Sequence, residues 1–486
     1  MHGPGQLRQL AQLEREQDNI RAALRRAVDG GEEQEALVLA LGMSWFWSLR
    51  DYHQEARGWY GAVAALGPDP YADDAPPAVP LLTGPLDAPL PMAPDMLAEA
   101  RRQVRLHLLM TMFTGSMAML GDVDATELGR RVLRTYTPDL PQAYRYPVVM
   151  RVFAAFLAGR MDELRPLLDD AVAGCRVHGT DGDLAFILQI RSRMLNDWVG
   201  GLEQAVADGA EALELFTRLG DRWGMSEALS AQGETAAKRG DYPLAVKSYR
   251  RAIDMVRDLG APHEIPMLQV RLGEALFETD QVEGERLLRE AMETVAWGSQ
   301  SGDGAMFYGR LVLCALHVER GEFREALDQL DQLEISQHAF GPIVPEVFLA
   351  IVSCLRGWAT AKGGDPQAGV ELLREARRLI NSVDSAASVF AEHMTVMLVL
   401  PAAGVLVALA QLDGDRRPAR KAAVLLGAHH GLHGQIGSYL ERRDRESTTR
   451  ALRALLGDEA FDEALAEGGR LSLSEATAML DEPGEF

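Results

Sequence analysis

Two histidines near the C-terminal end of the chain have a spacing that metal ligands use. His429 and His433 stand four residues apart in "AHHGLHGQ", and side chains at that spacing share one face of a helix. Gly431 and Gly434 weaken a helix at this place, and no cysteine or paired carboxylate stands close enough in the sequence to complete a set of ligands. We therefore expect packing histidines here, and no metal site.

Other patterns of enzyme chemistry are incomplete or missing. The stretch "PHEIPM", residues 262 to 267, begins like the H-E-x-x-H signature of zinc proteases, but it lacks the second histidine and contains Pro266. The sequence has no G-x-S-x-G, C-x-x-C, G-x-G-x-x-G or G-x-x-x-x-G-K-[ST] pattern. We expect that the chain is not an enzyme and carries no cofactor.

Aromatic residues gather near the N-terminus, in "WFW" at residues 45 to 47 and at Trp59. Such a cluster could clamp a ligand. Aromatic side chains bury large apolar areas, however, and more often form core. The sequence favours a core position for this cluster.

The overall composition describes an acidic protein. The 486 residues include 49 Lys and Arg against 71 Asp and Glu, which gives a formal charge of −22 and argues against direct binding to nucleic acid. Cys175, Cys314 and Cys354 are widely separated, so we expect reduced, buried thiols. The N-terminal stretch "MHGPGQLRQL" lacks the pattern of a secretion signal, and we expect a cytoplasmic protein.

Residues 394 to 412 form an uncharged stretch of nineteen residues, which is barely long enough to cross a bilayer. The flanking charges are acidic or mixed and give no positive-inside signal. We favour a helix that is buried on both sides within the protein over a membrane span.

Glycines recur at fixed intervals in the middle of the chain. Gly200, Gly220, Gly240 and Gly260 are spaced by 20 residues, and Gly240-Asp241 in "KRGDYPLAVKSYRRAI" resembles the end of one helix followed by the start of the next. Two helices of about 15 to 17 residues then form a unit of about 40 residues, in the range of helical repeats. The turns inside the predicted helix pairs fall near Arg50, Gly121, Gly159, Gly200, Gly240, Asp280, Gly321, Gly364 and Gly414.

Small residues recur at fixed distances from these turns. Glycine stands seven residues before the turn at 233, 273 and 357; alanine stands five residues after it at 205, 245 and 326, and twelve after it at 171, 212, 252 and 376. This pattern resembles the tetratricopeptide repeat (TPR), although these units are longer. The resemblance implies an all-α fold, a right-handed superhelical solenoid of about nine TPR-like hairpins with a concave face.

The domain organisation follows from the interruptions of this pattern. Residues 67–94 contain nine prolines and predict a loop or linker. The sequence therefore predicts N-terminal helices and a first hairpin over 1–66, a Pro-rich segment over 67–95, the solenoid over 96–435 and a C-terminal helical cap over 436–486. Whether the Pro-rich segment is ordered, and whether the first hairpin joins the same stack, stays open at this point.

Both ends of the chain resemble one family more closely. "LEREQDNIRAALRRAVDGG", continuing through "WFWSLRDYHQEARGWYGAVAAL", and the C-terminal "AAVLLGAHHGLHGQIG" with "LRALLGDEAFDEALAEGGRLSLSEATAML" are similar to the ends of a sensor region. That region belongs to large actinobacterial transcriptional regulators, the SARP/AfsR-type and LuxR-type proteins of the STAND ATPase class. In those proteins it follows a DNA-binding domain, a P-loop NTPase domain and a winged helix, which this sequence lacks.

The resemblance implies a sensor function in transcription regulation. The chain would bind a protein, a peptide or a small-molecule effector, and would restrain or release the NTPase and DNA-binding module of its regulator. The alternative is a stand-alone TPR adaptor for protein–protein interaction that has no part in transcription.

The resemblance also points to the residues of the binding groove. In the tetratricopeptide repeat, certain positions of the first helix of each pair face the concave side. The positions of this sequence that match them are Met194, Trp198, Glu234, Lys238, Glu274, Glu278, Tyr308 and Trp358. They mix apolar, aromatic and charged groups, as a peptide-binding groove does.

Overall fold

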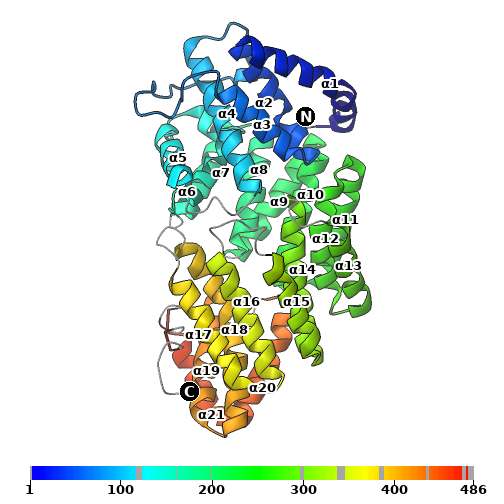
Figure 1. The fold of residues 1–486 in the computed structure, drawn as a ribbon, viewed down its shortest axis with the longest axis vertical. Helices are drawn as coiled ribbons and strands as arrows, with labels where there is room; N and C mark the ends of the chain where they lie inside the picture. Colours follow the sequence, from blue (N-terminus) through cyan, green and yellow to red (C-terminus); the bar gives the residue numbers. More distant parts are fainter. Residues whose placement is uncertain are drawn as a thin grey trace. The chain divides into compact units, whose positions relative to one another are not determined.

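The computed structural model spans the whole chain (Figure 1). It describes residues 3–115, 123–160, 163–196, 198, 200–295, 300–336, 345–382, 388–433, 437–472, 475 and 478–479. Within these residues the regular structure is entirely helical, and no strand occurs. The all-α prediction is confirmed.

The helices follow one another in antiparallel pairs after an N-terminal helix α1 (Gln6–Gly30). The pairs are α2 (Glu33–Leu49) with α3 (His53–Ala64), α4 (Pro94–Gly115) with α5 (Val123–Thr135), α6 (Val152–Leu157) with α7 (Leu164–His178), α8 (Asp181–Leu195) with α9 (Leu202–Leu219), α10 (Arg222–Lys238) with α11 (Tyr242–Leu259), α12 (Ile265–Leu276) with α13 (Gln281–Thr294), α14 (Gln300–Arg320) with α15 (Phe323–Ser336), α16 (Pro345–Lys362) with α17 (Pro366–Asn381), and α18 (Ser388–Asp413) with α19 (Arg416–His433). The helices α20 (Tyr439–Leu456) and α21 (Asp458–Gly468) follow them.

The contacts of the chain divide it into two compact units, and α10 and α11 contribute residues to both. Unit 1 consists of Met1–Leu195, Glu203–Gln232 and Arg251–Ile265, and unit 2 of Asn196–Leu202, Gly233–Arg250 and Pro266–Phe486. The boundaries that the sequence predicts at 66, 95 and 435 stay predictions.

The turns within the pairs lie where the sequence predicts them, wherever the structure describes the predicted position. Six of the glycines adopt the left-handed conformation that suits a residue without a side chain, with φ between 68° and 113°: Gly159, Gly200, Gly240, Gly321, Gly364 and Gly414. Asp280 instead caps the start of α13, since its side chain accepts from the backbone N of Glu283 at 3.0 Å. Gly121 lies outside the described residues.

Small residues allow the two helices of a pair to touch through their backbones. A Cβ atom on Gly273 in α12 would lie 2.6 Å from the carbonyl oxygen of Gly284 in α13, and one on Gly357 in α16 would lie 2.8 Å from that of Gly369 in α17. The alanines that follow the turns are buried, with at most 1% exposed at 205, 245 and 326. The pairs therefore pack as TPR-like hairpins, and this fold prediction is confirmed.

The Pro-rich segment is part of unit 1 and forms no α-helix before α4 begins at Pro94. Its Tyr71 is buried, and the hydroxyl donates to the carbonyl of Arg102 in α4 at 3.2 Å. Gln142 donates from Nε2 to the carbonyl of Val79 at 2.7 Å and accepts from the backbone N of Leu81 at 3.0 Å. The segment is therefore held in place by hydrogen bonds to its neighbours.

The aromatic cluster at residues 45 to 47 is core. Trp45, Phe46 and Trp47 are all buried in α2, and the ring of Trp45 meets that of Trp223 edge-on, with 4.7 Å between the ring centroids. Trp59 is only half-buried and donates to Glu55. The preference for core over a ligand clamp is correct for the first three residues.

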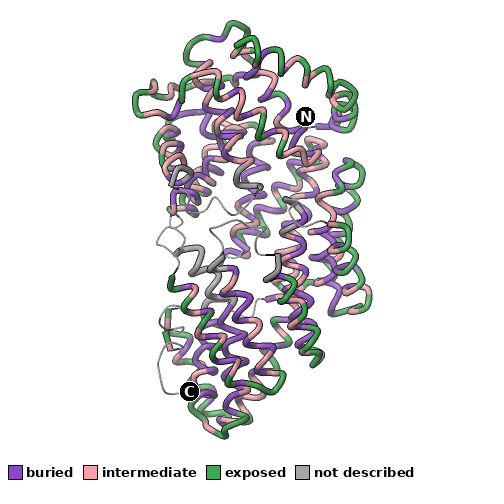
Figure 2. The backbone as a smooth tube through the Cα atoms, viewed as in Figure 1, coloured by how far each residue is buried: buried purple, intermediate pink, exposed green. Residues whose placement is uncertain are grey.

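Helix α18 forms the middle of the core of unit 2, as Figure 2 shows by the dense burial around α16 to α19. Its residues from Leu398 to Ala410 pack against α16, α17 and α19, with Pro401 inside the helix. Among the described residues, no helix combines the length and the apolar character that a membrane span needs.

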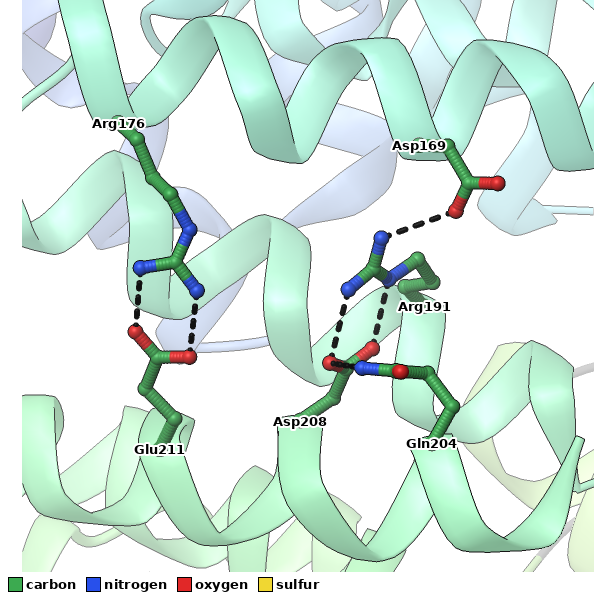
Figure 3. A network of polar contacts seen from close by, with 6 residues as sticks. All are labelled: Asp169, Arg176, Arg191, Gln204, Asp208 and Glu211. Carbon is green, nitrogen blue, oxygen red and sulfur yellow. Dashed lines mark hydrogen bonds and ion pairs between the residues drawn. The ribbon is translucent and has the colours of Figure 1, made fainter.

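Polar side chains fasten three helices of unit 1 together (Figure 3). Arg191 in α8 makes two hydrogen bonds to Asp208 in α9, at 2.6 and 2.8 Å, and one to Asp169 in α7 at 2.9 Å. Arg176 in α7 pairs with Glu211 in α9 through two bonds of 2.7 and 2.6 Å. The first pair is largely buried and the second is exposed, so only the first takes charge out of water.

Candidate recognition surface

The repeat brings one position of four successive helix pairs of unit 2 to equivalent places. Lys238, Glu278, Glu319 and Lys362 each stand two residues before the turn of their pair, and we call these four residues the turn row. A second position, six residues before the turn, carries Glu234, Glu274 and Trp358, which we call the inner row. Because each pair has nearly the same geometry, each row lies along one face of the array.

The turn row is in contact with helix α20. Going along this helix, Arg442 lies 3.9 Å from Glu278, and Arg443 lies 3.0 Å from Glu319. Lys362 forms an ion pair with Asp444. The backbone just before the helix takes part as well, because the N–H of Gly437 donates to the carbonyl of Lys238 at 3.4 Å.

The residues at the start of α20 cap the helix and contact the surface beneath it. Ser438 accepts from the backbone N of Glu441, and the Glu441 side chain accepts from the backbone N of Ser438, which is a capping box. Tyr439 meets Tyr242 edge-on, with 6.3 Å between ring centroids, and the guanidinium of Arg442 lies 4.9 Å from the centre of the same Tyr242 ring. Leu440 is 4% exposed and packs among apolar residues of α12 and α14.

The inner row is a network of paired groups rather than a row of free charges. Glu234 lies 3.1 Å from Arg271 and 3.9 Å from Lys238 of the turn row, which in turn donates to the carbonyl of Asn196 at 3.0 Å. The hydroxyl of Tyr308 donates to Glu274 at 2.6 Å. Burial raises the pKa of the Glu274 carboxyl, and the hydrogen bond from Tyr308 opposes that shift.

The predicted groove residues thus fall into three groups. Glu234, Lys238, Glu274, Glu278 and Tyr308 lie together on this face of unit 2. Met194 and Trp198 are half-buried; Met194 belongs to unit 1, whereas Trp198 belongs to unit 2.

Trp358 belongs to the core of unit 2 more than to its surface. It is 5% exposed, a Cβ on Gly404 in α18 would lie 2.8 Å from its ring, and the ammonium of Lys362 lies 5.0 Å from the ring centre. Its indole is therefore covered by α18 and by its own helix.

Sequence reasoning missed two members of the turn row, Glu319 and Lys362. Both could have been found by counting, because they stand at the same distance from their turns as Lys238 and Glu278. The sequence predicts a helical cap over 436–486, but nothing in it predicts that the first helix of this cap, α20, lies along the turn row.

A second polar cluster in unit 1 was also missed. Glu264 lies near Glu227, and burial, followed by the charge of Glu227, raises its pKa. Glu227 accepts from Gln189 at 3.3 Å and from Arg193 at 3.2 Å. His263 lies 3.7 Å from Glu264 and is the histidine of "PHEIPM". The cluster joins two acidic side chains that are distant in the sequence, so no local motif predicts it.

Metal-ligand geometry does not occur in the part of the chain that the structure describes, where no three His, Cys, Asp or Glu side chains are grouped to hold an ion. His429 is buried in α19, whereas the side chain of His433 lies outside the described residues.

Comparison with known proteins finds a resemblance among solved structures. No family model and no curated protein matches the chain. Among solved structures, the chain is similar to the crystal structure of the P58(IPK) TPR domain, with 13% identity over 78% of this chain and 98% of that chain, at a TM-score of 0.19. A score this low adds nothing to the helix packing described above, and the fold rests on that packing.

Proposed function

We propose that unit 2 recognises a helical segment of a partner protein along the turn row. The observation that carries this proposal is that the first turns of α20 pair with three members of the row, Glu278, Glu319 and Lys362. The backbone of Gly437, two residues before the helix, contacts the fourth, Lys238. A surface that positions one helix in this register has the geometry to position another.

The chemistry of the surface suits an amphipathic helix. Glu278 and Glu319 offer carboxylates that are 44% and 24% exposed, and the apolar cluster of α12, α13 and α14 residues includes the side chain of Leu440. Stacked helix pairs commonly use such faces for protein recognition, with apolar anchors for affinity and charges for register.

At a finer level, we propose that the chain is the sensor region of a transcriptional regulator. This rests on the resemblance of both ends to SARP/AfsR-type and LuxR-type proteins. In such a regulator, partner binding at the turn row would change how the array restrains the NTPase and DNA-binding module. We propose no catalytic role, because no motif of enzyme chemistry is complete in the sequence.

The proposal is tested by selecting helical peptides from a displayed library against the purified chain. Binding of the selected peptides is then measured for Glu278→Gln and Glu319→Gln, with Glu290→Gln as the matched control on the exposed side of α13. We expect the two turn-row variants to weaken binding several-fold and the control to leave it unchanged. Peptides that bind all three variants equally would place recognition elsewhere.

The regulator proposal has its own test. A P-loop NTPase module encoded with this chain is titrated calorimetrically with the chain and with its Glu319→Gln variant. Binding that the variant weakens supports the sensor role. Selected peptides that bind while the module does not would support the stand-alone adaptor instead.

A further inference from the structure

Helix α20 meets unit 2 through a stripe of residues spaced by four. The buried members are Leu440, Asp444, Thr448, Leu452 and Leu456. Two of these five are polar, and one of them, Asp444, is an acid whose pKa is raised by burial and is held down by its pair with Lys362. A helix that served only as permanent core would be expected to carry apolar residues at these positions.

The two halves of α20 are held by different forces. In the C-terminal half, Leu452 and Leu456 belong to the large core cluster of unit 2, together with Phe461 and Ala464 of α21. In the N-terminal half, Leu440 is the only described apolar residue of the helix that is fully buried among α12 and α14. The other contacts there are the ion pairs, a cation over the Tyr242 ring, and the partly buried Tyr439, which meets Tyr242 edge-on.

Two of these ion pairs are exposed and individually weak, whereas the pair of Asp444 with Lys362 is more buried. The side chains of the Arg442–Glu278 pair are 35% and 44% exposed, and those of the Arg443–Glu319 pair are 47% and 24% exposed. Exposed pairs of this kind contribute roughly 0 to 1 kcal/mol each. The first two turns of α20 therefore have fewer apolar contacts than its C-terminal half, which Leu452 and Leu456 anchor in the core.

We infer that the N-terminal half of α20, residues 438–445, is a built-in occupant of the recognition surface that a partner helix must replace. This inference rests on the proposed function and adds a regulation and a partner chemistry to it. While α20 is in place, it blocks the turn row; when a partner displaces it, the row becomes the partner's binding site.

The contacts of the occupant define what the partner must look like. Leu440 joins the apolar cluster of α12, α13 and α14 residues. The basic pair Arg442 and Arg443 meets Glu278 and Glu319, and Asp444 meets Lys362. The partner is therefore a helix with an apolar anchor, two basic residues at the second and third positions after it, and an acidic residue next. A helix with acidic residues at the two basic positions would be repelled.

The test uses a fluorescein-labelled synthetic peptide of residues 437–456 as the probe and the full chain as the receptor. Binding is measured by fluorescence anisotropy for the unchanged chain, for Arg443→Glu and for Arg450→Glu. The second variant is a matched control, because Arg450 lies exposed on the same helix and its described hydrogen bond goes only to the carbonyl of Glu446 in its own helix. Circular dichroism confirms that each variant is folded.

We expect the peptide to bind Arg443→Glu at least tenfold more tightly than it binds the other two chains. The reason is that an attached competitor acts at high effective concentration, and its release raises the fraction of chains whose surface is free. Equal affinities for the three folded chains, or no binding to any of them, would overturn the inference. In that case the proposed function still stands if library-selected peptides lose affinity for Glu278→Gln, and it fails as well if they do not.

Discussion

Arg443 on α20 donates two hydrogen bonds to one carboxylate oxygen of Glu319 on α14, from Nη2 at 3.0 Å and from Nε at 3.3 Å, although the residues stand 124 positions apart in the sequence. Glu319 holds this place because it stands two residues before the left-handed turn at Gly321. The repeat therefore sets the register in which the C-terminal helix docks, and each contact of the turn row follows from that register.

The buried ion pair of Arg191 and Asp208 in unit 1 is expected to matter more than its exposed neighbour. Substituting Arg191→Met leaves the carboxylate of Asp208, which is 2% exposed, without its charged partner. We expect a loss of about 3 to 5 kcal/mol in the free energy of unfolding, the usual cost of breaking a buried pair from one side. Urea unfolding followed by circular dichroism measures it.

The control is the other pair in Figure 3, Arg176 and Glu211, whose side chains are 48% and 36% exposed. Arg176→Met removes the same kind of group from the same set of helices and should cost about 0 to 1 kcal/mol. Equal losses for the two variants would show that the burial of Asp208 does not decide the outcome.

The close contact between α12 and α13 predicts opposite effects for two substitutions of glycine by alanine. Gly273→Ala places a methyl group 2.6 Å from the carbonyl oxygen of Gly284, so the helices must move apart, at a cost of roughly 1 to 3 kcal/mol. Gly61→Ala in α3 meets nothing within 4 Å and should stabilise by up to about 1 kcal/mol, because alanine favours helix. Urea unfolding measures both variants. A Gly273→Ala protein that is as stable as the unchanged chain would contradict the close backbone contact.

His107 predicts a loss of stability on acidification. It is buried in α4, where its ring stacks on Tyr60 with 5.3 Å between centroids, and burial lowers its pKa to about 4 from the usual 6.5. Below pH 6.5 the histidine binds a proton in the unfolded chain, whereas in the folded protein it stays neutral until about pH 4. The free energy of unfolding should therefore fall by roughly 3 kcal/mol across this window from this residue alone.

This pH dependence is measured as the difference between the unchanged protein and His107→Gln in urea unfolding at several pH values. The difference should shrink as the pH falls from 6.5 to 4, because the variant lacks the titrating group. His430→Gln, at an exposed histidine of α19, serves as the control and should follow the unchanged protein. A constant difference for His107→Gln would mean that the histidine titrates normally in the folded state.

The sequence predicts the helix pairs well because their determinants are local. A left-handed glycine closes a helix through its own backbone, as at Gly240, and the carboxylate of Asp241 accepts from the backbone N of Leu244 at the start of the next helix. The small residues at 233, 273 and 357 repeat at fixed distances from such turns. The residues that determine the packing of each pair therefore all lie within about 40 residues of sequence.

The occupied surface could not be predicted in the same way. Leu440 finds its neighbours in α12 and α14, more than a hundred residues earlier, and nothing near it in the sequence marks that contact. Trp358 shows the converse: it stands at the same repeat position as Glu234 and Glu274, yet α18 covers it because Gly404 leaves room for its ring. Contacts between residues that are distant in the sequence decide the environments of Leu440 and Trp358. The spacing of the repeat does not predict such contacts.

The most direct test of the docking of α20 on the turn row is a charge-reversal cycle at Arg443 and Glu319, measured by hydrogen–deuterium exchange of peptides from residues 439–445. Arg443→Glu and Glu319→Arg each place like charges together, so each should speed exchange there about tenfold, equivalent to roughly 1.4 kcal/mol. The double variant should return exchange toward that of the unchanged chain, while residues 452–468 stay protected in all four proteins. Single variants that exchange like the unchanged chain, or a double variant that exchanges as fast as the faster single, would contradict the docking of α20 on the turn row.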